Sequence, residues 1–203
     1  MEQNEFDEQF SELEATLDVG PDSYRFANAV EIWENIGSAS LDKFFIGLAE
    51  LYLDSNDKQR QTLYEYCGQK KVILENLWYF IRRIGVLIYT GDDKRWLDIG
   101  IACAILDGGR VDPRDLIVSL VLLRYFAEEQ KIDAKGVFDK FIQSAEGGVK
   151  GILENAQNYP KSSIRGIVHS FGPPKEQNHN NDQKTFWKIT RGFITPRNKD
   201  VSK

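Results

Sequence analysis

The sequence has few of the residues and motifs from which common catalytic and metal sites are built. Two histidines, His169 and His179, occur in 203 residues. The chain has no HExxH motif, CxxC motif, nucleophile elbow or phosphate-loop pattern. His169, His179 and Asp182 are too few ligands for a closed zinc site, which needs four. We therefore expect no metal and no cofactor, and the sequence leans towards a protein that is not an enzyme.

Features of secreted and membrane proteins are also scarce. The two cysteines, Cys67 and Cys103, are too few for a disulfide framework, and their apolar helical surroundings predict free, buried thiols. The start, MEQNEFDEQF, has neither the basic residues nor the apolar stretch of a secretory signal. The most apolar stretch, 72–88, contains charged residues, so it predicts a buried helix and no membrane span. A cytoplasmic location is expected.

Charge is unevenly distributed along the chain, although the total is only −5. Residues 1–57 carry 14 acidic and 2 basic side chains, a net of −12, whereas residues 58–172 carry 14 acidic and 17 basic, a net of +3. Residues 173–203 carry 3 acidic and 7 basic side chains, a net of +4. This separation indicates contacts driven by charge, within the chain or with a partner.

Apolar residues recur with helical spacing along most of the chain, and strand-like alternation is nearly absent. We expect helices around residues 6–17, 22–37, 40–52, 60–67, 69–89, 93–107, 113–130, 133–142 and 147–159. In the run LDGGRVDPRDLIVSL, Gly108-Gly109 signals a helix end and Asp112-Pro113 a helix start. The helix that follows, 113–130, is apolar most of the way round, which predicts a central position.

Two arrangements of these helices are open. An offset of 41 residues places 78–101 over 119–142, near the period of paired-helix solenoids. The matching charged residues are Arg83, Asp92, Lys94 and Asp98 with Arg124, Asp133, Lys135 and Asp139. The fold class is therefore all-α, with residues 1–172 forming a single irregular multi-helix bundle or a short paired-helix, HEAT-like array of about eight or nine helices.

The composition changes after Pro173-Pro174, and residues 173–203 are predicted to be a polar, basic tail. Residues 175–183 have no apolar side chain and read as a linker. An aromatic, basic segment follows at 186–194 and is the predicted partner-binding site, formed by Phe186, Trp187, Lys188, Ile189, Arg191 and Phe193. This segment could fold back on the helical part, bind a protein partner, or touch nucleic acid or a membrane surface.

Charged clusters in the helical part have simple structural interpretations. Asp54 to Glu65 resembles a calcium loop but lacks the central glycine, so Asp57 is expected to cap the next helix. Six aspartates gather around one set of turns, where a hard cation or acid–base chemistry is the alternative to capping: Asp92, Asp93, Asp98, Asp107, Asp112 and Asp115. Three basic doublets, Lys70-Lys71, Arg82-Arg83 and Lys94-Arg95, are expected on solvated faces or against an anionic surface.

Three functions follow from these features. The first is a non-enzymatic helical adaptor or scaffold that binds another protein, with a homo-oligomer left open. The second is a nucleic-acid accessory protein that uses the doublets and the tail, which the net charge of −5 and the pI near 5.2 disfavour. The third is an enzyme whose site combines scattered helical residues, for which the candidates are Asp98, Asp115, Arg82, Arg83 and Arg124.

Overall fold

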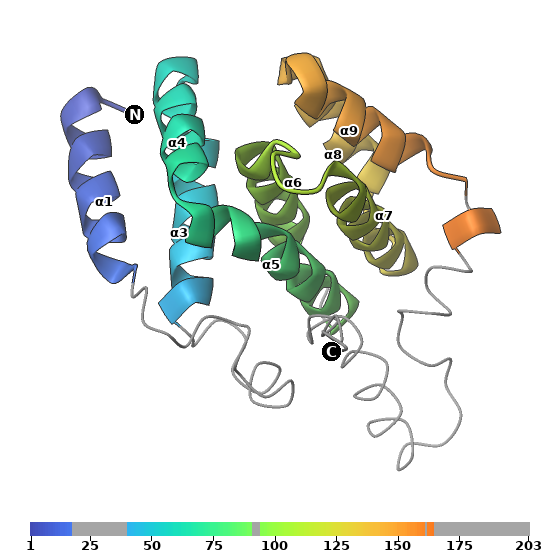
Figure 1. The fold of residues 1–203 in the computed structure, drawn as a ribbon. Coiled ribbons are helices and arrows are strands. Elements are labelled where there is room, and N and C mark those ends of the chain that lie inside the picture. Colours follow the sequence, from blue (N-terminus) through green and yellow to red (C-terminus); the bar gives the residue numbers. More distant parts are fainter. Residues whose placement is uncertain (18–39, 91–93, 161, 165–203) are drawn as a thin grey trace, which may run out of the picture.

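The computed structural model describes residues 1–17, 40–90, 94–160 and 162–164, and this part of the chain is all-α, as predicted. Figure 1 shows α1 at one edge of the molecule, α9 towards the other, and α5, α6 and α7 between them. The helices are α1 (Gln3–Thr16), α3 (Ser40–Asp54), α4 (Asp57–Gln69), α5 (Lys71–Thr90), α6 (Arg95–Asp107), α7 (Pro113–Glu129), α8 (Ala134–Ser144) and α9 (Gly147–Asn158). The helix expected around 22–37 lies outside the described residues, as does the tail 173–203.

Helix α6 lies at the centre of the core. It packs against α3, α4, α5, α7 and α8, and its residues from Ile99 to Asp107 are all buried. Gly100 lets α7 approach closely, because a Cβ atom there would lie 2.6 Å from Cδ2 of Leu123. The sequence predicted α7 as the central helix. Helix α7 is indeed buried along most of its length, but α6 is the helix surrounded by neighbours.

The helices form an irregular bundle that contains the predicted pairs. Helix α5 packs along both α6 and α7, α6 also touches α8, and α7 packs on α9. These contacts match the predicted arrangement, in which the pair α5–α6 stacks on the pair α7–α8. Helix α6 additionally contacts α3 and α4, so the pairs are not layered as a regular two-layer array would be. None of the described helices is long and apolar enough to cross a membrane.

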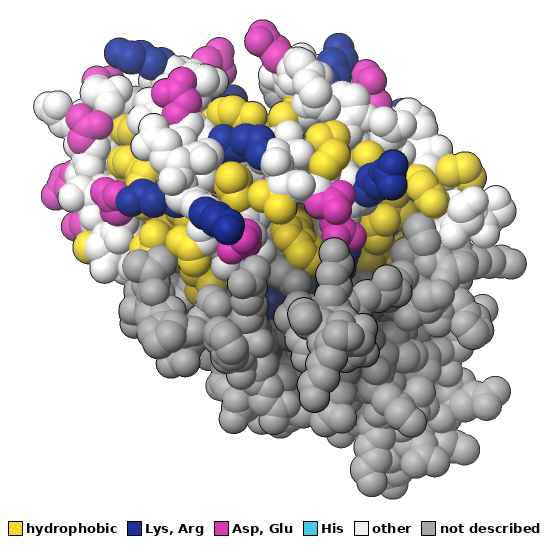
Figure 2. Space-filling model, viewed as in Figure 1, with side chains coloured by type: hydrophobic (Ala, Val, Ile, Leu, Met, Phe, Trp, Pro, Cys, Tyr) yellow, Lys and Arg dark blue, Asp and Glu magenta, His cyan; other side chains and the backbone are white. Residues whose placement is uncertain are grey.

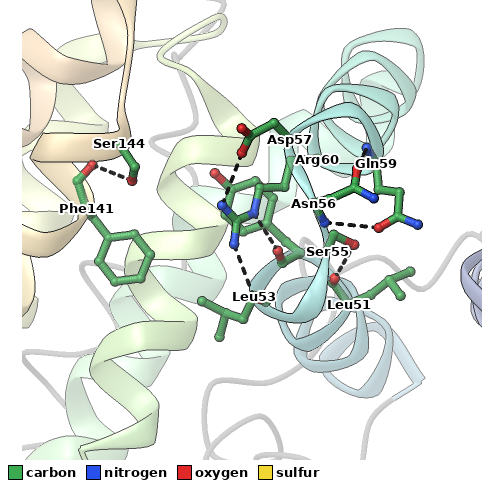
Figure 3. Close-up of polar contacts among 10 residues, drawn as sticks. Leu51, Leu53, Ser55, Asn56, Asp57, Gln59, Arg60, Phe141 and Ser144 are labelled. Atoms are coloured by element: carbon green, nitrogen blue, oxygen red, sulfur yellow. Dashed lines mark hydrogen bonds and ion pairs between the residues drawn. The ribbon is translucent and has the colours of Figure 1, made fainter. Parts of the chain in front are cut away.

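Helix ends explain where the chain turns. Asp112 and Asp133 cap α7 and α8 as predicted, each accepting from backbone N–H groups of the first turn. The prediction that Asp57 caps α4 is wrong. Asn56 is the N-cap, because its side chain accepts from Gln59 N at 3.1 Å while Gln59 Oε1 accepts from Asn56 N at 3.0 Å (Figure 3).

The predicted short helix 60–67 is also longer than expected, because Gly68 does not stop it. Helix α4 runs through Gly68 to Gln69. A Cβ atom at this position would collide with the guanidinium of Arg110, which lies directly against the glycine. Gly68 is therefore a point of close approach between α4 and the turn after α6, and it does not mark the helix end.

Candidate interaction surfaces

Two of the five residues named for an enzymatic site come together, but they bind each other. Arg82 on α5 contacts Asp115 Oδ1 at 2.9 Å through Nη2, and donates to Ser119 Oγ at 2.9 Å through Nε. The same guanidinium lies 4.5 Å from the Trp78 ring centroid. This cluster ties α5 to α7, and its charges are balanced within the fold.

Arg83 points in a different direction from its neighbour and enters the core. Its Nη2 contacts Asp42 Oδ2 on α3 at 2.6 Å, and the two side chains are 5% and 0% exposed. Removing two charges from water is costly, and the close contact between them offsets part of that cost. The pair links α3 to α5, which contact each other little elsewhere.

Arg124, the counterpart of Arg83 in the sequence offset, has another role. It is 3% exposed and donates to the carbonyl oxygens of Ala156 and Tyr159 at 2.8 and 3.0 Å, at the C-terminal end of α9. Arg60 acts in the same way on α3, donating to Tyr52 and Leu53 carbonyls at 3.1 and 3.2 Å (Figure 3). Both arginines donate to main-chain carbonyls at the C-terminal end of a helix, where intrahelical donors are few.

The aspartates around the turns do not converge on a metal site. No group of metal-ligating side chains occurs within the described ranges, and Asp92 and Asp93 lie outside them. Asp98 lies on α6, where burial raises its pKa and the charges of Lys140 and Lys94 lower it. The structure therefore separates Asp98 from the Arg82–Asp115 pair and gives each its own partners.

Among the aspartates of this group that the structure describes, Asp107 alone is fully buried, at 1% exposure. Its Oδ1 accepts from Gly109 N at 2.9 Å, and its Oδ2 is buried with no hydrogen-bond partner among the described residues. Burial raises its pKa to about 6, against the opposing effects of the Gly109 hydrogen bond and the Arg110 charge. The sequence placed Asp107 near a turn, but nothing in the pattern distinguished this carboxyl from its exposed neighbours.

The two thiols are buried and unreactive. Cys67 and Cys103 are free and 0% exposed. Burial raises the pKa of Cys67 to about 12 and that of Cys103 well above its usual value. Since the thiolate is the nucleophile, neither residue is suited to covalent catalysis.

A polar cleft of about 610 Å³ lies where α7 and α9 end and α8 begins. Its lining includes Arg124, Glu128, Asp133, Lys135 and Tyr159. Arg124 already binds α9 carbonyls, and Lys135 pairs with Asp139 at 2.7 Å. The described residues that line the cleft include no buried carboxylate pair of the kind that acid–base catalysis uses. Sequence reasoning missed it, because Asp133 and Tyr159 appeared only as helix boundaries.

The basic doublets do not form a cationic patch, because carboxylates neutralise most of them. Lys70 pairs with Glu14 at 3.9 Å and Lys71 with Glu75 at 3.5 Å. The pairs already described account for Arg82 and Arg83, and Arg95 pairs with Glu50. These pairs leave Lys94 as the member of the three doublets without a carboxylate in ion-pair contact within the described residues.

The outer surface of α1 is strongly acidic. Its inner side packs through Phe6, which is 2% exposed, and through Phe10 and Leu13. The opposite side carries Glu5, Glu8 and Glu12, which are all exposed and lie on one stripe at i, i+3 and i+7; we call this stripe the acidic face. Figure 2 shows acidic side chains gathered along the edge where α1 lies.

A half-buried seam of aromatic and charged residues runs between α1 and α4. We call it the α1–α4 seam, formed by Phe10, Glu14, Tyr66 and Lys70. Phe10 and Tyr66 meet edge to face at 4.9 Å, and Lys70 Nζ lies 5.4 Å from the Tyr66 ring centroid. Burial, with a smaller effect of Glu14, raises the pKa of Tyr66 above its usual range.

The predicted partner-binding residues Phe186, Trp187, Lys188, Ile189, Arg191 and Phe193 lie outside the described residues, so their assignment remains a prediction. Comparison with known proteins gives no match to a family model, to a curated protein or to a solved structure. The functional argument therefore depends on the surfaces described above.

Proposed function

We propose that this chain is a non-enzymatic helical adaptor domain that binds another protein, and that the acidic face of α1 is one of its contact surfaces. The observation that carries the proposal is the charge of α1. The helix has five acidic side chains and no basic one, and Glu5, Glu8 and Glu12 present three of them along one exposed stripe.

This arrangement is unfavourable for α1 itself. Like charges at i, i+3 and i, i+4 destabilise a helix by about 0.2–0.5 kcal/mol per pair. Glu14 also lies in the last turn of the helix, where the macrodipole disfavours negative charge, although Glu5 in the first turn is favoured. The N-cap residue, Glu2, makes no side-chain capping bond. Packing of Phe6 and Phe10 holds the helix in place, so the acidic stripe is not needed for folding. Proteins keep such an unfavourable placement of charge on a helix mainly where the surface has a function.

A basic protein surface is the partner that such a stripe suits. Nucleic acid is disfavoured, because its phosphates would be repelled by α1 and the described doublets are largely neutralised by carboxylates. The aromatic segment 186–194 stays a predicted second contact, and the cytoplasm stays the predicted location.

Affinity capture from native lysate treated with nuclease tests the proposal. The bait Glu5→Gln/Glu8→Gln/Glu12→Gln should lose a protein that the wild-type bait holds, and that capture should weaken with salt. The control bait, Glu129→Gln/Glu146→Gln/Glu154→Gln, removes three exposed acids from α7 and α9 and from the turn between α8 and α9, and should capture normally. Equal loss with both baits, or capture unaffected by either, would contradict a contact through the acidic face.

A further inference from the structure

We infer that the basic segment 184–203 of this chain binds its own acidic face. The contact itself does not depend on the proposed function. Its consequence does: a partner that uses the acidic face would have to displace the segment, so the contact would be autoinhibitory.

Charge complementarity supports this occupant. Residues 184–203 contain six basic side chains and one acidic, a net of +5. Helix α1 has five acidic side chains and no basic one. Every other described helix contains at least one basic side chain. Helices α3 to α5 and α7 to α9 each contain lysine or arginine, and α6 begins with Arg95. The most basic part of the chain thus has one matching surface in the described fold.

The chain is long enough to reach. Twenty residue steps separate Ile164, the last described residue, from Lys184. An extended chain of that length spans up to roughly 65 Å. A helical domain of this size is about 40 Å across. The segment can therefore cross the molecule from α9 to the α1 edge without disturbing any described helix.

Zero-length carbodiimide cross-linking of the full chain, followed by peptide mass spectrometry, tests the inference. The reagent joins a carboxylate and an amine only when they are in contact. We expect amide links from Lys184 or Lys188 to Glu5, Glu8 or Glu12, and we expect them to disappear in molar salt, where the Debye length is about 3 Å. Links spread evenly over exposed acids such as Glu129 and Glu154 would overturn the inference.

A mixture of unlabelled and ¹⁵N-labelled chains separates contact within one chain from contact between two. Peptide pairs of uniform label at low protein concentration support the intramolecular contact, whereas mixed-label pairs would show that a second copy is the occupant and would overturn it.

Charge variants give a second readout that does not depend on cross-linking chemistry. In the full chain, Lys184→Gln/Lys188→Gln/Arg191→Gln should shift the amide resonances of Glu5 to Glu12. The control, Lys58→Gln/Lys131→Gln/Lys150→Gln, removes three exposed lysines of the helical body and should not shift them. Unchanged α1 resonances in the first variant would overturn the inference while leaving partner binding by the acidic face untouched.

Discussion

The guanidinium of Arg110 lies 3.9 Å from the ring centroid of Tyr64, and its Nη1 donates to the carbonyl oxygen of the same residue at 3.0 Å. Its Nε donates to the Asp107 carbonyl oxygen at 3.0 Å, and its Nη2 to that of Leu106. One side chain therefore holds the end of α6 against α4. The sequence marked this turn only as a helix end and start, but Arg110 makes it a fixed joint between α4 and α6.

Replacing Arg110 by alanine should destabilise the fold by about 1–3 kcal/mol, because hydrogen bonds from a charged donor to three carbonyls are lost. Arg110→Lys should recover little of this, since an ammonium group cannot reproduce the planar fork. Urea unfolding of each variant measures the change. Arg114→Ala is the matched control, because Arg114 is exposed four residues away. If Arg110→Ala and Arg114→Ala unfold at the same midpoint, the joint does not stabilise the fold.

Asp107 should make the protein more stable in mild acid than at neutral pH. Burial raises its pKa from 3.8 to about 6, so the folded state binds a proton that the unfolded state does not bind between these values. The contribution of this residue to the free energy of unfolding therefore rises as pH falls from about 7 to about 4. Two pKa units correspond to at most about 3 kcal/mol.

Asp107→Asn isolates this effect from the other carboxyl groups. The amide keeps an oxygen to accept from Gly109 N and carries no charge. The variant should be more stable than the wild type at pH 7.5 and nearly equal to it at pH 4.5, as measured by urea unfolding at both values. A difference that stays constant across this range would show that the buried carboxyl does not titrate there.

The helices were predictable because their patterns are local. The apolar stripe of α1 and the Asp112 and Asp133 caps depend on residues within a few positions of each other, and the structure confirms them. The errors arise where a distant side chain decides the outcome. The sequence predicted a helix end at Gly68. The glycine is instead needed because Arg110, 42 positions later, lies where a Cβ atom would be.

The candidate surfaces were predictable only in part, for the same reason. The acidity of the first third is visible in the composition, and it reappears as the acidic face. Arg82 and Arg83 are neighbours in the sequence, yet one reaches Asp115 and the other Asp42. No local pattern indicates that these arginines are neutralised by carboxylates more than 30 residues away, and the same holds for the cleft around Arg124.

The protein should be more stable with glycine in place of Lys131. It has φ of 60° and lies at the position after the C-cap of α7, where Ile132 N donates to Ala127 O at 2.9 Å and Lys131 N to Glu128 O at 3.0 Å. These two bonds define a Schellman turn, in which glycine is the usual residue. Lys131→Gly should raise the free energy of unfolding by about 0.5–1 kcal/mol. It removes the strain of the left-handed conformation, and this gain exceeds the cost of the greater entropy that glycine gives the unfolded chain. A lower thermal midpoint in the variant would contradict this.

Gly148 and Gly151 in α9 should each tolerate alanine with a gain in stability. A Cβ atom at either position would meet nothing within 4 Å, and both residues are helical. Each substitution should add about 0.5–1 kcal/mol, because alanine has the higher helix propensity and the smaller entropy in the unfolded chain.

Gly136 in α8 provides the opposite case in the same molecule. A Cβ atom there would collide with the carboxylate of Asp133, which caps the helix by accepting from Gly136 N at 2.9 Å. Gly136→Ala must displace that carboxylate, and the loss of a cap costs about 1 kcal/mol. Thermal unfolding of the three single variants should therefore raise the midpoint for Gly148→Ala and Gly151→Ala and lower or leave it unchanged for Gly136→Ala. The reverse order would show that the bare surface of α9 needs its glycines for a reason other than space.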